Sequence, residues 1–208
     1  MTYKMNFEEL QQAADAAMSE ALSSAGFRRT AAGTWSRRRG DELNVIQFQE
    51  HSTEKIFCVN LGIHYTFLPK AGTEASLNGD QIKPPDCELK LRLTEQPTVK
   101  DQWWPIAEST VDEVSELVCS RGLLIFDSYR LAGPIAAMDG KSIEMGNPGL
   151  LGSITKVRAC LLIARLHEYL GNLDKAVEAA TIGVKLAGMA VGPKKALMDI
   201  LKRLEQPA

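Results

Sequence analysis

The fold is decided by two stretches, Asn44-Val-Ile-Gln-Phe-Gln49 and Phe57-Cys-Val-Asn-Leu-Gly-Ile-His-Tyr65. Apolar residues recur at every second position in both, which is typical of β-strands because successive side chains on a strand point to opposite faces. Only a short polar segment separates the two stretches. We therefore expect antiparallel neighbours, since parallel pairing needs a long crossover connection.

The two faces of this predicted sheet differ in chemistry. In the second stretch one face carries only apolar and aromatic side chains, namely Phe57, Val59, Leu61, Ile63 and Tyr65. The other face carries Cys58, Asn60 and His64. In the first stretch Gln47 and Gln49 alternate with Ile46 and Phe48. The pattern predicts one buried face and one face of amides and an imidazole.

Composition restricts the class of protein. The chain has 208 residues, of which 45% are hydrophobic and 24% charged, as in ordinary globular domains and unlike disordered chains. A formal net charge of -2 makes nucleic acid an unlikely partner. Arginines cluster at 28–29 and 37–39. We expect them at a solvated strand edge, where basic side chains discourage unwanted pairing.

The cysteines and the apolar runs bear on cofactors and location. Cys58, Cys87, Cys119 and Cys160 are widely spaced and contain no CxxC pair, which argues against a zinc site. We expect no metal and no cofactor. The first six residues lack the apolar core of a signal peptide, and no apolar run reaches the length of a membrane span. These observations predict a cytoplasmic protein without a membrane partner.

The remaining patterns predict an α+β fold. Asn6, with Glu9 three residues later, is a capping box that starts a helix, and Gly26 ends it. Strands follow from residue 27 to 65, and a further strand at 87–93 completes an antiparallel sheet of about five strands. Residues 109–122 are helical, whereas 123–126 fit a strand or a short helix. Trp103-Trp104-Pro105 is expected to anchor the core.

The C-terminal part has a different organisation. We expect a sheet domain at 1–130, a Gly/Pro-rich connection at 131–152, and a helical tail at 153–208. The tail is predicted to be a helical hairpin plus a final helix. Its turn, Leu170-Gly-Asn-Leu-Asp-Lys-Ala176, is similar to that of one tetratricopeptide repeat. Because such repeats need several stacked copies, we expect the tail to dock on the sheet domain and not to form a peptide-binding array.

Candidate site residues follow from the polar face. Amides both donate and accept hydrogen bonds, and arginine presents a rigid fork to carboxylates, phosphates or carbonyls. The candidates for binding a ligand or partner are Arg37, Gln47, Gln49, Asn60, His64 and Arg92. Two interpretations remain open: the face is exposed and binds a partner, or the first helix or the C-terminal hairpin covers it. No catalytic motif is recognisable, so no catalytic residue is assigned.

Several ordered segments carry a family resemblance. They are Gly26-Phe-Arg-Arg29, Trp35-Ser-Arg37, Asn44–Gln49 with Ser52, Val59-Asn-Leu-Gly-Ile63, Asp86-Cys87, Arg92-Leu93 and Trp103-Trp104. Over residues 6–130 the chain resembles the bacterial family known as domain of unknown function 4304. The resemblance implies a small α+β domain with an antiparallel sheet and no established activity. Some relatives look like accessory proteins of bacterial toxin or phage-defence loci.

Two functions are consistent with these observations. The first is a non-catalytic binding module, an immunity-like or phage-defence accessory protein of bacteria whose partner is a toxin or defence protein. The alternative is a small phosphate-ester hydrolase or nuclease that uses Arg37, His64 and Arg92. An enzyme requires a concave site where these groups converge, whereas a binding module can present a flat patch.

Overall fold

The computed structural model describes residues 5–71, 75, 82–96 and 98–205. The chain forms two compact units, Met1–Asp127 and Ser128–Ala208. Among the described residues, no helix combines the length and the apolar character needed to cross a bilayer.

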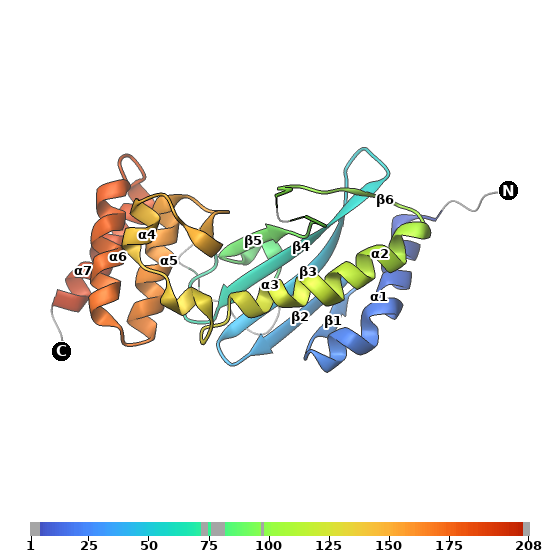
Figure 1. Cartoon of the computed structure of the whole chain (residues 1–208), viewed down its shortest axis with the longest axis horizontal. Coiled ribbons are helices and arrows are strands. Elements are labelled where there is room, and N and C mark those ends of the chain that lie inside the picture. The colour runs from blue at the N-terminus through green and yellow to red at the C-terminus, as the bar shows by residue number, and fades with distance from the viewer. Residues whose placement is uncertain (1–4, 72–74, 76–81, 97, 206–208) are drawn as a thin grey trace. The chain divides into compact units, whose positions relative to one another are not determined.

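The first unit is built on an antiparallel sheet (Figure 1). Its strands are β1 (Arg28–Ala31), β2 (Thr34–Arg39), β3 (Glu42–Glu50), β4 (Ile56–Tyr65) and β5 (Leu89–Arg92), and they are ordered as in the sequence. A two-residue strand, β6 (Trp104–Pro105), also pairs with β4. The long pairing of β3 with β4 runs from Glu42 opposite Tyr65 to Glu50 opposite Phe57. The α+β class and the antiparallel sheet are confirmed.

Helix α1 (Phe7–Ser24) begins and ends where the sequence predicts. The Asn6 side chain accepts a hydrogen bond from the Glu9 amide at 3.0 Å, and the Glu9 carboxylate accepts from the Asn6 amide at 2.8 Å. Gly26 follows the helix with a φ of 84°, a left-handed conformation that favours glycine. Four apolar residues at helical spacing, Leu10, Ala14, Met18 and Leu22, are fully buried.

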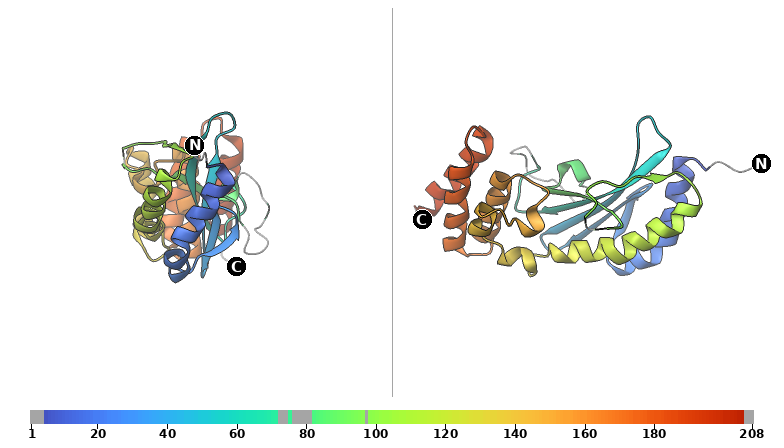
Figure 2. Two further views of the ribbon diagram at one scale, coloured as in Figure 1. Left: turned by 90° about the vertical axis from the view of Figure 1, so that its right-hand side faces the viewer. Right: turned by 45° about the horizontal axis from the view of Figure 1, so that its top comes forward.

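A second helical rod follows the sheet, and it settles the ambiguity at residues 123–126. Helix α2 (Ser109–Leu117), the π-helical turn η2 (Val118–Gly122) and α3 (Leu123–Ser128) form one continuous rod, yellow-green in Figure 2. Both α1 and this rod pack on the apolar face. The Phe57 ring of that face lies 6.4 Å from Phe7 of α1, and Phe27 lies 5.5 Å from Phe126 of α3.

The opposite face is covered at one end by the 3₁₀ turn η1 (Pro84–Asp86) and its neighbours. Leu43, Val45, Ile82 and Cys87 form a buried apolar cluster there. Gly62 of β4 allows this approach: a Cβ atom at Gly62 would lie only 2.6 Å from the Cys87 Sγ. The face predicted to be polar is therefore divided into a covered half and an open half.

The second unit is helical. It contains α4 (Gly140–Glu144), α5 (Lys156–Tyr169), α6 (Leu173–Leu186) and α7 (Val191–Glu205), with short 3₁₀ turns at Pro134–Ala137 and Gly149–Leu151. Two glycines permit close helix packing, because a Cβ at Gly140 would lie 2.8 Å from the Ala179 Cα and one at Gly183 would lie 2.8 Å from Leu197. The expected hairpin and final helix are present. Docking of this tail on the sheet remains a prediction.

Candidate functional site

The open half of the outer sheet face carries four of the predicted site residues. Gln47 lies directly opposite Asn60 in the β3–β4 register, and Asn60 lies opposite Arg92 in the β4–β5 register. Residues directly opposite each other share a face, so these three side chains project together, with Gln49 two positions further along β3. Gln49 is exposed and the other three are partly exposed. We call these four side chains, together with Trp103, the outer patch.

The amides of the outer patch are only half used. Asn60 Nδ2 donates to Gln49 Oε1 at 2.7 Å. No described residue takes the Nε2 donors of Gln49 or donates to Oδ1 of Asn60, and the Gln47 amide makes no side-chain hydrogen bond within the described part of the chain. The pair therefore leaves one donor and one acceptor group available to a ligand, which is the combination needed to recognise a peptide group.

Arg92 is held in place by the segment that leads into β6. Its Nε lies 3.2 Å from Oδ1 of Asp101, and the other oxygen of Asp101 accepts from the Trp103 indole at 3.1 Å. The guanidinium carbon lies 4.8 Å from the centre of the Trp103 ring, a cation–π arrangement. The His51 ring packs against the same indole in a T-shaped arrangement, with the ring centres 4.9 Å apart. The ion pair and the indole ring thus orient Arg92, although its Nη1 has no partner within the described ranges.

The His64 side chain projects from the same face of the sheet as the amides of the outer patch. It lies in the covered half of that face, where it is fully buried. The amide of Glu88 donates to Nδ1 at 3.1 Å, so Nδ1 carries the lone pair. Nε2 then carries the proton and faces the Leu68 carbonyl at 3.3 Å. Burial lowers the pKa of His64, with smaller opposing effects from the Leu68 carbonyl and Asp86. The ring is a neutral connector between two chain segments, with no access to a ligand.

This environment predicts a pH-dependent stability. A free histidine titrates near pH 6.5, so below about that pH the unfolded chain binds a proton that the folded protein excludes at His64. The free energy of unfolding should therefore fall as the pH is lowered from about 7.5 to about 5.5. Urea unfolding at several pH values measures this, with His64→Gln compared with His51→Gln. The His64 variant should show a flatter slope than the His51 variant; equal slopes would contradict the assignment.

Arg37 does not belong to the outer patch. In the β2–β3 register it lies opposite Asn44, on the face covered by the helices, and only 5% of its surface is exposed. Its Nε and Nη2 donate to Asn44 Oδ1 at 3.1 and 2.8 Å, and its Nη1 donates to the Ala25 carbonyl at 3.0 Å. The guanidinium also lies over the rings of Phe27 and Phe126. The expectation that all the clustered arginines are solvated is wrong for Arg37.

The three residues assigned to the alternative enzyme are therefore dispersed. Arg37 is buried on one face, His64 is buried in the covered half of the other, and only Arg92 reaches the open surface. Burial also raises the pKa of the Cys87 thiol, which disfavours the nucleophilic thiolate. Within the described ranges, no group of three or more His, Cys, Asp or Glu residues is placed to hold a metal ion. The geometry gives hydrogen bonding and stacking, without a converging reactive group.

Trp103 and Asp101 were not among the predicted site residues. Trp104 is buried, as expected of a core anchor, but Trp103 is half-buried beside Arg92. The Trp103-Trp104 pair in an extended segment could have indicated that only one of the two indoles is buried, because adjacent side chains on a strand point to opposite sides.

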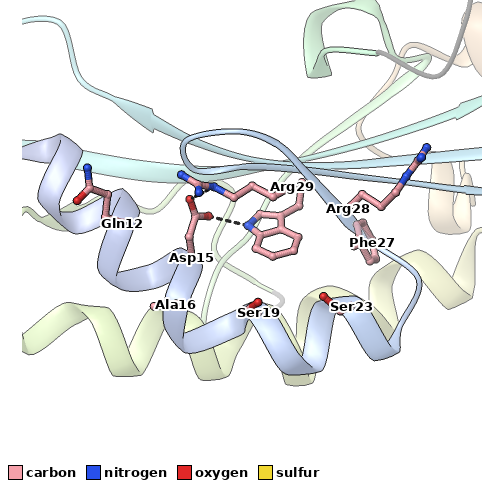
Figure 3. Close-up of a pocket in the computed structure, with 9 residues that line it drawn as sticks. Gln12, Asp15, Ala16, Ser19, Ser23, Phe27, Arg28 and Arg29 are labelled. Atoms are coloured by element: carbon pink, nitrogen blue, oxygen red, sulfur yellow. Dashed lines mark hydrogen bonds and ion pairs between the residues drawn. The ribbon is translucent and has the colours of Figure 1, made fainter.

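A second feature of the first unit is a groove between α1 and β1, with a volume of about 470 Å³ (Figure 3). Gln12, Ala16, Ser19 and Ser23 line it from α1, and residues 27–29 line it from the start of the sheet. Asp15 and Trp35 lie at its base and are buried. Asp15 is the one charged residue among the buried positions of α1, which are otherwise apolar. The helical spacing of the sequence is therefore sufficient to identify Asp15 as a buried carboxylate.

Comparison with known proteins identifies a family. The model of the family described as domain of unknown function (DUF4304) matches residues 18–121, which extend from α1 to the π-helical turn. The outer patch and most of the residues that line the groove lie within this range. Searches of curated proteins and of solved structures found no significant match.

Proposed function

Because the chain belongs to the family described as domain of unknown function (DUF4304), whose description records no activity, we propose a function from the geometry of the site. The protein is a non-catalytic binding module, and the outer patch is the surface that its partner contacts. The partner is another protein, because a solvent-accessible sheet face of amides, an arginine and an indole suits a protein surface better than an enclosed small molecule.

One observation carries this proposal. The outer patch combines an amide pair with unused hydrogen-bonding groups and an arginine oriented by an aspartate and a tryptophan. Arginine and tryptophan are the residues that most often dominate the energy of protein interfaces. Preorganised side chains also lose less conformational entropy on binding, which favours affinity.

The finer parts of the proposal concern partner and location. We propose a bacterial protein that acts in the cytoplasm and occupies a toxin or another defence protein, in the manner of an immunity or phage-defence accessory protein. The support comes from the resemblance stated above and from the four cysteines, all of which are free thiols, as is usual in reducing compartments.

Substitutions in the outer patch should separate binding from stability. Arg92→Ala removes an ion pair whose partner, Asp101, is 58% exposed, and such pairs contribute no more than about 1 kcal/mol. The variant should therefore melt close to the wild type. Truncation of a hot-spot arginine, the role proposed for Arg92, costs at least about 2 kcal/mol of binding free energy, so partner affinity should fall at least about thirtyfold.

Site-specific photocross-linking in cells of the source organism provides the measurement. A photoreactive residue at Gln49 should give a discrete cross-linked product that is lost in the Arg92→Ala background. The matched control places the same residue at Glu116, which is exposed on α2 away from the sheet face. Equal products at both positions, or a product at Gln49 that survives Arg92→Ala, would refute the outer patch as the partner surface.

A further inference from the structure

His51 continues the row of outer-patch side chains along β3. Side chains on a strand alternate between faces, so His51 projects from the same face as Gln47 and Gln49. The pairing of β3 with β4 also extends to this residue, because the His51 amide donates to the Ile56 carbonyl at 2.9 Å. The ring is partly exposed and contacts Trp103 of the outer patch. His51 is therefore placed to influence that surface from its border.

The turn after β3 fixes the orientation of the His51 imidazole. The backbone amides of Thr53 and Glu54 donate to its Nδ1, at 3.4 and 3.2 Å. A backbone N–H is always a donor, so Nδ1 carries the lone pair and Nε2 carries the proton of a neutral ring. Two donors from one turn restrict rotation of the side chain. The β3–β4 turn thus presents a ring of fixed orientation to Trp103.

The backbone that carries Trp103 is anchored separately. Gln102 and Glu95 close the base of the segment between β5 and β6. The Glu95 amide donates to Oε1 of Gln102 at 2.7 Å, and Nε2 of Gln102 donates to the Glu95 carboxylate. These bonds fix the main chain and involve no atom of the indole. The orientation of the indole ring therefore depends on the contacts that the ring itself makes.

Each neighbour of the Trp103 indole restrains it differently. Asp101 accepts from the indole N–H at 3.1 Å, which fixes one atom of the ring and leaves the ring able to pivot about it. Arg92 lies 4.8 Å from the ring centre, but its guanidinium is the group expected to contact the partner. His51 packs with its ring plane at 86° to the indole, a favoured geometry for aromatic pairs. This contact restricts the pivot and uses no group that the partner needs.

We propose that His51 is a positioning residue for partner binding. Its ring holds the Trp103 indole in the orientation on which the Arg92 guanidinium stacks, and so keeps Arg92 directed toward the partner. The inference rests on the function proposed above and adds to it a residue that does not itself bind. An indole free to pivot would leave the binding arrangement only partly populated, and apparent affinity falls in proportion to that population. The turn after β3 thereby contributes to affinity through preorganisation.

Two substitutions separate the ring of His51 from its role in the turn. His51→Asn keeps an acceptor for the amides of the turn, as asparagine does in turns generally, but removes the ring. His51→Phe keeps a ring beside Trp103 but removes the acceptor. The NMR order parameter of the Trp103 indole N–H in the free protein is the first measurement. It should fall from about 0.85, typical of rigid groups, toward about 0.6 in His51→Asn, and stay near the wild-type value in His51→Phe.

The photocross-linked product at Gln49 measures the consequence for the partner. It should fall about two- to tenfold in His51→Asn, the change that corresponds to loss of one aromatic pair, and less than about twofold in His51→Phe. An unchanged order parameter in His51→Asn, or equal losses in the two variants, would overturn the positioning role. A mobile indole with an undiminished product would overturn its connection to binding. A product that survives Arg92→Ala would instead refute the function proposed above, and not the positioning of Trp103.

Discussion

Replacement of Gly62 by alanine should destabilise the first unit by about 1–3 kcal/mol, the range of overpacking in a closely packed region. A Cβ at this position would lie 2.6 Å from the Cys87 Sγ and 3.2 Å from the Cα of Pro84, and the second of these is backbone. The backbone of Gly62 does not adopt a positive φ, so conformational strain plays no part. In the absence of a clash, alanine would stabilise a strand by about 0.5–1 kcal/mol through chain entropy. The sign of the effect therefore decides whether residues 84–87 pack on β4.

Tryptophan fluorescence during urea unfolding is the suitable measurement. All three tryptophans, Trp35, Trp103 and Trp104, lie in the first unit, so the signal reports that unit alone. Cys87→Ala removes the atom that makes the closest contact and provides the matched control. Gly62→Ala should cost less in the Cys87→Ala background than in the wild type, because the two side chains share one space. Additive effects, or a stabilised Gly62→Ala variant, would show that residues 84–87 do not rest on β4.

Arg37→Ala is the second substitution with a large expected effect, a loss of about 2–4 kcal/mol, because two buried acceptors lose a charged donor and a buried side chain is removed. The change leaves the Asn44 Oδ1 and the Ala25 carbonyl without their donors from Arg37. It also opens a cavity between the rings of Phe27 and Phe126, where the guanidinium now lies. Because Ala25 is the C-cap residue of α1 and its carbonyl accepts from Arg37 of β2, the variant should lose this attachment between the helix and the sheet.

Two neighbouring variants give the comparison. Arg37→Lys keeps the charge but cannot donate with the geometry of a planar fork, so its loss of stability should be intermediate. Arg38→Ala changes an exposed side chain and should alter the free energy of unfolding by no more than about 0.5 kcal/mol. Similar effects at positions 37 and 38 would contradict the buried role of Arg37.

Local patterns were sufficient to predict most of the elements. The capping box at Asn6 and Glu9 involves residues within one helical turn, so it can be predicted from their spacing in the sequence. The structure contains it as expected. The alternation in residues 44–49 and 57–65 predicted which side chains share a face, because parity along a strand is a property of the backbone itself. The grouping of Gln47, Gln49, Asn60 and Arg92 follows from that parity and from the order of the strands.

Burial on each face was not predictable in this way. Arg37 projects from the same face of β2 as Trp35. The sequence of β2 has no apolar alternation, however, that would reveal which of its two faces meets the helices. His64 has the same parity as Asn60, but it is buried because residues 82–87 fold back over one end of the sheet. Trp103 and Asp101 reach Arg92 only because β6 returns the chain to the edge of β4.

The sequence by itself determined the α+β class, the capped first helix, the antiparallel strands, the parity of their side chains and the family. Each of these depends on spacing within a few residues or on ordered short segments. The tertiary structure alone decided which half of the amide face is open, that Arg37 is internal, and that a groove lies between α1 and β1. These depend on contacts between residues far apart in the chain, where packing and desolvation, and not local spacing, set the free energy.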